Sequence, residues 1–206
     1  MIGIVDYGSG NVRSVANALS MIGAEARLCS TPEQLGSAER LVLPGVGAFG
    51  HCIDSLRARG FDRVLETLVM RERRPILGIC VGMQLMARSS TEGGAHAGLG
   101  WFDAGIERLA PAAARLRVPQ VGWNAVEHRE PCALFADVPQ QADLYFVHSY
   151  WMRCRHDNDV VAWCDYDGRV TAAVQRDNIV ATQFHPEKSQ DFGLAILHNF
   201  VRWTPD

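Results

Sequence analysis

The sequence has no long apolar run, no excess of positive charge and no C-x-x-C cysteine pair. Its longest apolar segments are far shorter than the roughly 20 residues of a membrane-spanning helix, so we expect no membrane association. The net charge of −3 offers no basic surface of the kind that binds nucleic acid. The opening MIGIVDYGSGN lacks the basic region and cleavage site of a signal peptide, and it is expected to be the first strand of the fold.

The cysteines are few and widely dispersed for a chain of 206 residues. Such a set favours reduced thiols over a disulfide scaffold, which predicts a cytoplasmic location. With 48% hydrophobic residues, no low-complexity linker and no internal repeat, residues 1–206 are expected to fold as a single domain around one core.

Strand-like and helix-like segments alternate along the first half of the chain. Short apolar segments at residues 2–5, 26–29, 40–43 and 76–78 are each followed by a helical pattern. Four such rounds predict an α/β fold with a mostly parallel sheet and helices on both faces.

The second half of the sequence has a different pattern. Residues 92–100 are rich in glycine and are expected to be a loop, and strands are expected near residues 103–109, 125–128 and 144–149. The Asp167-Gly168 turn lies between two apolar segments, so residues 160–184 are predicted to be an antiparallel C-terminal meander. A last helix is expected to start near residue 189 and to bury Phe192, Ile196, Phe200 and Trp203.

A cysteine occupies the turn between the fourth strand and its helix, in the sequence GICVGMQLMAR. The pattern G-x-C-x-G has the form of a nucleophile elbow, with Cys80 in place of serine. Glycines allow the tight turn, and the free N–H groups at a helix start stabilise a thiolate. A lone buried cysteine is more often structural, but the flanking glycines favour a nucleophile.

A cysteine nucleophile needs a base and a group that orients this base. His185 follows an apolar strand, and Glu187 lies two residues later. Alternate residues of an extended chain project from one face, about 6–7 Å apart, so Glu187 could hold one imidazole nitrogen while the other faces the thiol. An isolated His-Pro-Glu turn on the surface would be the simpler interpretation. Together with the elbow, the pattern predicts a Cys-His-Glu triad.

An acyl-transfer site also needs donors for the oxyanion. The backbone N–H of Val81 is one candidate, and the loop of Gly45, Val46 and Gly47 at the end of a neighbouring strand could supply another. The G-x-G-x-x-G of this loop imitates a dinucleotide fingerprint, but the acidic strand end expected after it is absent. His185-x-Glu187 imitates the H-x-E of zinc deaminases without their P-C-x-x-C. We therefore expect no cofactor and no metal.

Five motifs, GICVGMQLM, PGVGAFG, PQVGWN, YFVHSYW and QFHPEKS, resemble the glutaminase subunits of imidazole glycerol phosphate synthase. These subunits are class I glutamine amidotransferases with a flavodoxin-like fold, and the resemblance extends from DYGSGN to the last helix. Met83 stands where related anthranilate and guanylate enzymes usually have histidine. Val81 replaces a common leucine, with little effect expected because its backbone N–H is the functional group.

The resemblance implies that Cys80 attacks the side-chain amide of L-glutamine, that His185 transfers the proton and that Glu187 orients His185. Ammonia would then pass to a cyclase subunit that makes imidazole glycerol phosphate and aminoimidazole carboxamide ribotide in histidine biosynthesis. By the same resemblance, the glutamine pocket would contain Gly47, Val81, Gln84, Glu92, His148, Ser149 and Tyr150. Gln84 has independent support, because it lies one helical turn after Cys80.

The resemblance also implies a heterodimer with the cyclase subunit. The interface residues would be Asn11, Arg13, Trp123, Asn124 and Lys188. Trp123 on a glycine-flanked loop could be an interface anchor, or it could equally be packed in the core. Other interpretations are a related class I member such as the glutaminase of pyridoxal phosphate synthase, a cysteine peptidase or hydrolase on this fold, and a non-enzymatic assembly subunit.

Overall fold

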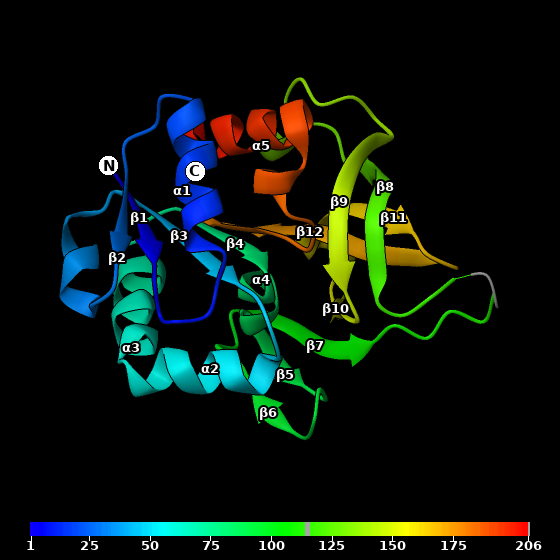
Figure 1. Cartoon of the computed structure of the whole chain (residues 1–206), viewed down its shortest axis with the longest axis horizontal. Helices are drawn as coiled ribbons and strands as arrows, with labels where there is room; N and C mark the ends of the chain where they lie inside the picture. Colours follow the sequence, from blue (N-terminus) through cyan, green and yellow to red (C-terminus); the bar gives the residue numbers. More distant parts are fainter. Residues whose placement is uncertain (114–115, 206) are drawn as a thin grey trace.

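The computed structural model describes residues 1–113 and 116–205. These residues form a nine-stranded sheet with the order β2-β1-β3-β4-β13-β12-β11-β8-β9 and a four-stranded sheet with the order β10-β7-β5-β6 (Figure 1). The parallel strands of the large sheet are β1 (Ile2–Val5), β2 (Ala26–Cys29), β3 (Arg40–Gly45), β4 (Ile76–Cys80) and β13 (Ile179–Thr182).

From β13 onward the neighbouring strands of the large sheet run antiparallel. These strands are β12 (Arg169–Arg176), β11 (Val160–Asp165), β8 (Gln120–His128) and β9 (Ala142–His148). The small sheet contains β5 (Ala87–Ser90), β6 (His96–Ala97), β7 (Phe102–Arg108) and β10 (Tyr150–Cys154). The large sheet is thus parallel in one half and antiparallel in the other, with β13 between them.

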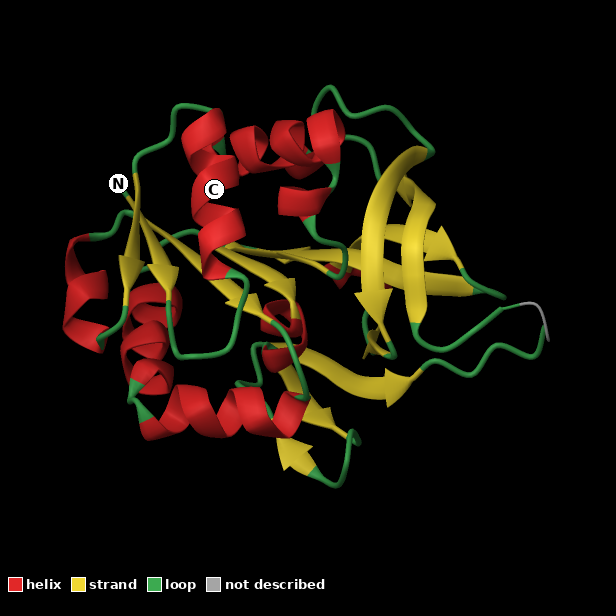
Figure 2. Cartoon of the chain, in the orientation of Figure 1, coloured by secondary structure: helices red, strands yellow, loops and turns green. Residues whose placement is uncertain are grey.

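Helices cover both faces of the parallel half (Figure 2). On one face lie α1 (Val12–Met21) and α5 (Gln190–Arg202), and on the other lie α2 (Phe49–Ala58) and α3 (Phe61–Leu65). The short helix α4 (Val81–Leu85) follows β4 directly. The remaining helical turns are η1 (Pro32–Ser37), η2 (Glu66–Arg71), η3 (Ala133–Phe135), η4 (Asp157–Asp159) and η5 (Pro186–Lys188). The predicted fold class is therefore confirmed.

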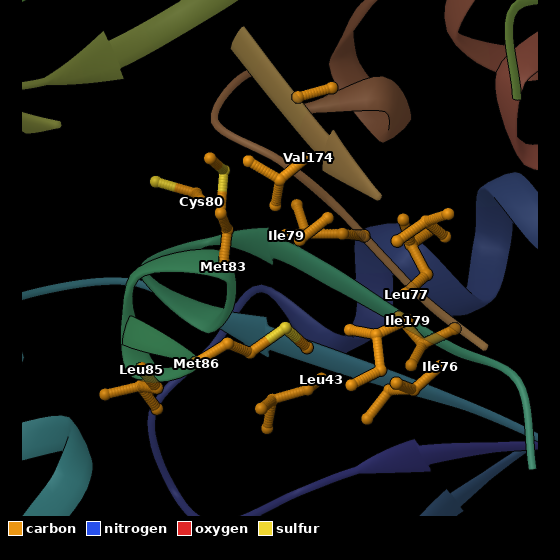
Figure 3. Close-up of a cluster of buried hydrophobic side chains, with 14 of the residues drawn as sticks. Leu43, Ile76, Leu77, Ile79, Cys80, Met83, Leu85, Met86, Val174 and Ile179 are labelled. Carbon is orange, nitrogen blue, oxygen red and sulfur yellow. The ribbon is translucent and has the colours of Figure 1, made fainter. Parts of the chain in front are cut away.

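The strand that carries Cys80 lies in the middle of the core. Every residue of β4 is buried, because the helices cover both faces of the sheet. Around it, the side chains of Leu43, Ile79, Ile179 and Met86 gather in one apolar cluster (Figure 3). This packing fixes the end of β4, and with it the position of Cys80.

The helix predicted after the elbow is shorter than its sequence suggested. Met86 to Arg88 are good helix formers, but α4 ends at Leu85 and β5 begins at Ala87. Ala87 pairs with Phe102 of β7, and the N–H of Phe102 donates to the Met86 carbonyl at 3.0 Å. Sheet pairing across the fold therefore outweighs the local helix propensity.

Three further expectations need correction. The glycine-rich segment 92–100 contains the short strand β6, which pairs with β5. Phe192 of α5 is 38% exposed, whereas Ile196 and Phe200 are buried as predicted. Trp123 lies within strand β8 rather than on a loop, and its 47% exposure excludes the core-packing alternative. No described helix has the length and apolar character needed to cross a membrane.

Candidate active site

Cys80 adopts a backbone conformation that L-residues rarely take, with φ 54° and ψ −112°. The turn is tight enough that neighbouring glycines have no room for a side chain. A Cβ on Gly82 would lie 1.8 Å from the Leu43 carbonyl oxygen, and one on Gly45 would lie 2.7 Å from the Gly82 nitrogen. The strand-turn-helix interpretation of the G-x-C-x-G motif is therefore confirmed.

His185 and Glu187 form a buried pair at the end of the neighbouring strand, β13. The imidazole Nδ1 lies 2.8 Å from Glu187 Oε1, and both side chains are almost fully buried. The pairing comes from the turn η5 and not from an extended strand, because the chain bends at Pro186. His185 Nε2 has no hydrogen-bond partner among the described residues, so this nitrogen is free to serve Cys80.

The electrostatic surroundings of His185 favour its charged form. Burial alone would lower the pKa of this imidazole, but Cys80 and Glu187 more than offset burial and raise the pKa to about 9. A raised imidazole pKa beside a cysteine favours transfer of the thiol proton to the histidine. The arrangement can therefore hold a charged imidazole beside Cys80.

A cavity of about 280 Å³ opens over Cys80. It contains every residue predicted for the glutamine pocket. Its lining is Val46, Gly47, Cys80, Val81, Gln84, Glu92, Pro119, Val147, His148, Ser149, Tyr150, His185 and Lys188. The structure thus brings together segments from both halves of the chain at the carboxyl ends of the parallel strands.

Glu92 is more than an exposed loop acid. Its Oε2 accepts the backbone N–H of Phe49 at 2.8 Å, at the start of α2. The residue before α2 is Ala48, which has no side-chain acceptor of its own. Glu92 therefore closes the N-terminus of α2 and at the same time contributes to the cavity wall.

His148 lies in the cavity wall but is not placed as the base. Its Nδ1 lies 2.8 Å from the Tyr150 carbonyl oxygen, and its Nε2 lies 3.1 Å from Gln120 Oε1. Burial lowers the pKa of His148 to about 4, despite the Tyr150 carbonyl. The neutral ring faces a backbone carbonyl and an amide side chain rather than a carboxylate, which agrees with the prediction that His185, and not His148, pairs with a carboxylate.

The two expected sources of oxyanion donors lie beside each other. Val81 follows the nucleophile, and Gly47 lines the same cavity with φ 103°. The Cys52 thiol donates to the Val46 carbonyl at 3.4 Å. In a trans peptide the C=O and the following N–H point in opposite directions, so the Gly47 N–H points away from Cys52. Within the described residues, no group of three His, Cys, Asp or Glu could hold a metal ion.

Comparison with known proteins decides the family. A family model described as glutamine amidotransferase class-I matches residues 3–203. The imidazole glycerol phosphate synthase subunit HisH of Mesorhizobium japonicum is 44% identical over 214 residues, which cover 99% of each chain. The HisH subunit of Leptospira interrogans is 44% identical over 203 residues, 98% of this chain and 99% of its own. This chain belongs to the HisH family.

Solved structures agree with the fold of a HisH chain. A crystal structure of a glutamine amidotransferase superposes with a TM-score of 0.75 at 21% identity, covering 97% of this chain and 98% of its own. The structure of PurLQS from Thermotoga maritima also gives 0.75, at 17% identity, with 97% and 96% covered. These superpositions support the fold, and the 44% identity to HisH subunits confirms the predicted membership in the glutaminase subunits of imidazole glycerol phosphate synthase.

In this HisH chain the residues expected at the partner interface lie at three elements, α1, β8 and η5, and among them only Lys188 lines the cavity over Cys80. Asn11 precedes α1 and Arg13 lies in its first turn, and α1 contacts η5, where Lys188 lies. Trp123 meets the ring of Tyr145 edge-on at 5.8 Å, and Lys188 Nζ lies 5.8 Å from the same ring. The amide of Asn124 donates to the Asp165 carbonyl of β11 at 3.0 Å, so Asn124 is partly held within the sheet.

Sequence reasoning missed one buried residue beside the nucleophile. Gln183 precedes the His-Pro-Glu motif, is fully buried, and places its Nε2 3.8 Å from the Cys80 sulfur. A polar residue at the end of an otherwise apolar strand was the available signal. Its partner could not be inferred, because the pairing of β13 with β4 is not visible in the sequence.

Proposed function

We propose that this chain hydrolyses L-glutamine to glutamate and ammonia with a triad of Cys80, His185 and Glu187. The observation that carries the proposal is the buried His185–Glu187 pair at 2.8 Å beside a cysteine held at a strained elbow. The whole chain acts as a single amidotransferase domain. It works in the cytoplasm, where its six free cysteines stay reduced.

The proposed reaction proceeds in two steps. His185 Nε2 takes the Cys80 thiol proton, and the sulfur attacks the amide carbon of glutamine. The N–H groups of Val81 and Gly47 stabilise the oxyanion, and imidazolium protonates the departing ammonia. Water then attacks the γ-glutamyl thioester and gives a proton to His185, which passes it to the departing Cys80 sulfur as glutamate is released. Glu187 keeps Nδ1 protonated and the ring oriented throughout.

The remaining cavity residues bind the substrate, and the chain docks on a cyclase subunit. Gln84, Glu92, His148, Ser149 and Tyr150 surround the glutamine. Asn11, Arg13, Trp123, Asn124 and Lys188 contact the cyclase, which receives the ammonia for synthesis of imidazole glycerol phosphate and aminoimidazole carboxamide ribotide. Val46, Val121 and Trp123 are exposed apolar side chains that such a partner would cover.

The test is the Cys80→Ala variant, assembled with the cyclase subunit. Glutamate release and glutamine-dependent synthesis should both be lost, while synthesis from added ammonium salt should continue. The matched control is Cys29→Ala, because Cys29 is also buried and free but lies on β2. Glutamine-dependent synthesis that survived in Cys80→Ala would refute the proposed nucleophile.

A further inference from the structure

Two glutamine side chains connect the Cys80 sulfur to a backbone carbonyl. Gln84 Nε2 lies 2.9 Å from the Tyr150 carbonyl oxygen and 3.0 Å from Gln183 Oε1. Gln183 Nε2 lies in turn 3.8 Å from Cys80 Sγ. Both side chains are almost fully buried, so water does not compete for these contacts.

The orientation of the two side-chain amides follows from the Tyr150 carbonyl, at which this series of hydrogen bonds ends. A carbonyl oxygen only accepts hydrogen bonds, so Gln84 must turn its NH₂ group toward Tyr150. The second N–H of that group then reaches Gln183, which must present its oxygen to Gln84. The NH₂ group of Gln183 is therefore left facing the sulfur.

We infer that Gln183 stabilises the Cys80 thiolate by donating an N–H to the sulfur, with its direction set by the Tyr150 carbonyl through Gln84. The inference rests on the proposed function, in which Cys80 is the nucleophile. Gln183 does not line the cavity, so it acts on the sulfur from behind and not on the substrate. Such a donor matters because α4 has only five residues and its dipole is correspondingly small.

The other titratable groups near the sulfur come from different elements. His185 and Glu187 lie at the end of β13 and in η5, Tyr7 follows β1, and Cys52 lies on α2. Glu92, His148, Tyr150 and Lys188 line the cavity in front. All of these groups stay in place when Gln183 is replaced, so a change in thiol ionisation would report the amide.

The experiment measures the rate at which iodoacetamide alkylates Cys80 across pH, followed by mass spectrometry of the Cys80 peptide. In Gln183→Met, the apparent pKa of alkylation should rise by about one unit, the size of one hydrogen bond to a charged group. Gln183→Glu should raise it further, because a carboxylate would face the sulfur. In both variants kcat for glutamine should fall about tenfold, with KM nearly unchanged.

The matched control is Gln175→Met. Gln175 also contacts a cysteine at 3.8 Å, but this is Cys132, and the thiol is the donor. The Cys80 profile should be unchanged in this control. An unchanged profile in Gln183→Met, or an equal shift in Gln175→Met, would overturn the inference.

A second variant tests the role of the hydrogen bond between Gln84 and Gln183 even if Gln183→Met does not fold. Gln84→Met releases the Gln183 amide from its fixed direction, so the apparent pKa should rise by less than in Gln183→Met. Where both fold, the double variant should shift no further than Gln183→Met alone; full additivity would overturn the inference. If these profiles shift but Cys80→Ala still releases glutamate, the proposed function fails and the thiolate contact stands.

Discussion

Replacing Cys80 by glycine should leave the protein more stable than replacing it by alanine. At φ 54° a non-glycine residue costs about 1–3 kcal/mol, because its Cβ crowds the backbone. Glycine avoids this cost but loses roughly 0.5–1 kcal/mol through its greater freedom in the unfolded chain. Cys80→Gly should therefore exceed Cys80→Ala in free energy of unfolding by roughly 0.5–2 kcal/mol. Both variants lack the thiol, so the effect of its loss on His185 cancels.

Urea unfolding followed by circular dichroism measures this difference, and thermal unfolding should show about 2–4 °C per kcal/mol for a chain of this length. The control is Ala172→Gly in the middle of β12, where the side chain is also fully buried. There the usual order holds, and glycine should destabilise the protein by about 1 kcal/mol. If Cys80→Gly were the less stable of the two Cys80 variants, the elbow would not store backbone strain.

Two further predictions concern the elbow and the buried pair. Gly82→Ala should destabilise the protein by several kcal/mol in urea unfolding, because its Cβ would meet the Leu43 carbonyl at 1.8 Å. The control is Gly105→Ala, where a Cβ has open space, and it should change stability by less than about 1 kcal/mol. Equal effects of the two substitutions would contradict this prediction. The fold raises the pKa of His185 from 6.5 to about 9. This shift should contribute on the order of 3 kcal/mol of stability below pH 6.5, and the contribution should be lost as pH rises through 9. Urea unfolding across this pH range should show a shallower loss in Glu187→Gln, and identical slopes would refute the assignment.

Patterns of a few neighbouring residues were sufficient to predict the elements that depend on short-range contacts. Alternating apolar strands and helices predicted β1 to β4, and the glycines around Cys80 predicted the elbow. His185 and Glu187 were paired correctly because they lie two residues apart. These features depend on contacts within a few residues, which a sequence displays directly.

Long-range pairing could not be predicted in the same way. The segment from Met86 to Arg88 has helical propensity but leads into β5 because β7 lies beside it. The second sheet and the place of β13 next to β4 depend on residues far apart in the chain. For the same reason, nothing in the sequence indicated that Gln183 would lie behind Cys80.

The position of β13 in the large sheet has a consequence for the folding of the protein during its synthesis. β13 pairs with β4 from Ile179 opposite Ile76 to Thr182 opposite Ile79, although the strands β5 to β12 lie between them in sequence. During synthesis Cys80, the proposed nucleophile, emerges well before the strand that leads to His185, its proposed base. In the proposed mechanism, an unfinished chain therefore has Cys80 without His185 beside it, and it cannot hydrolyse glutamine before β13 joins the sheet.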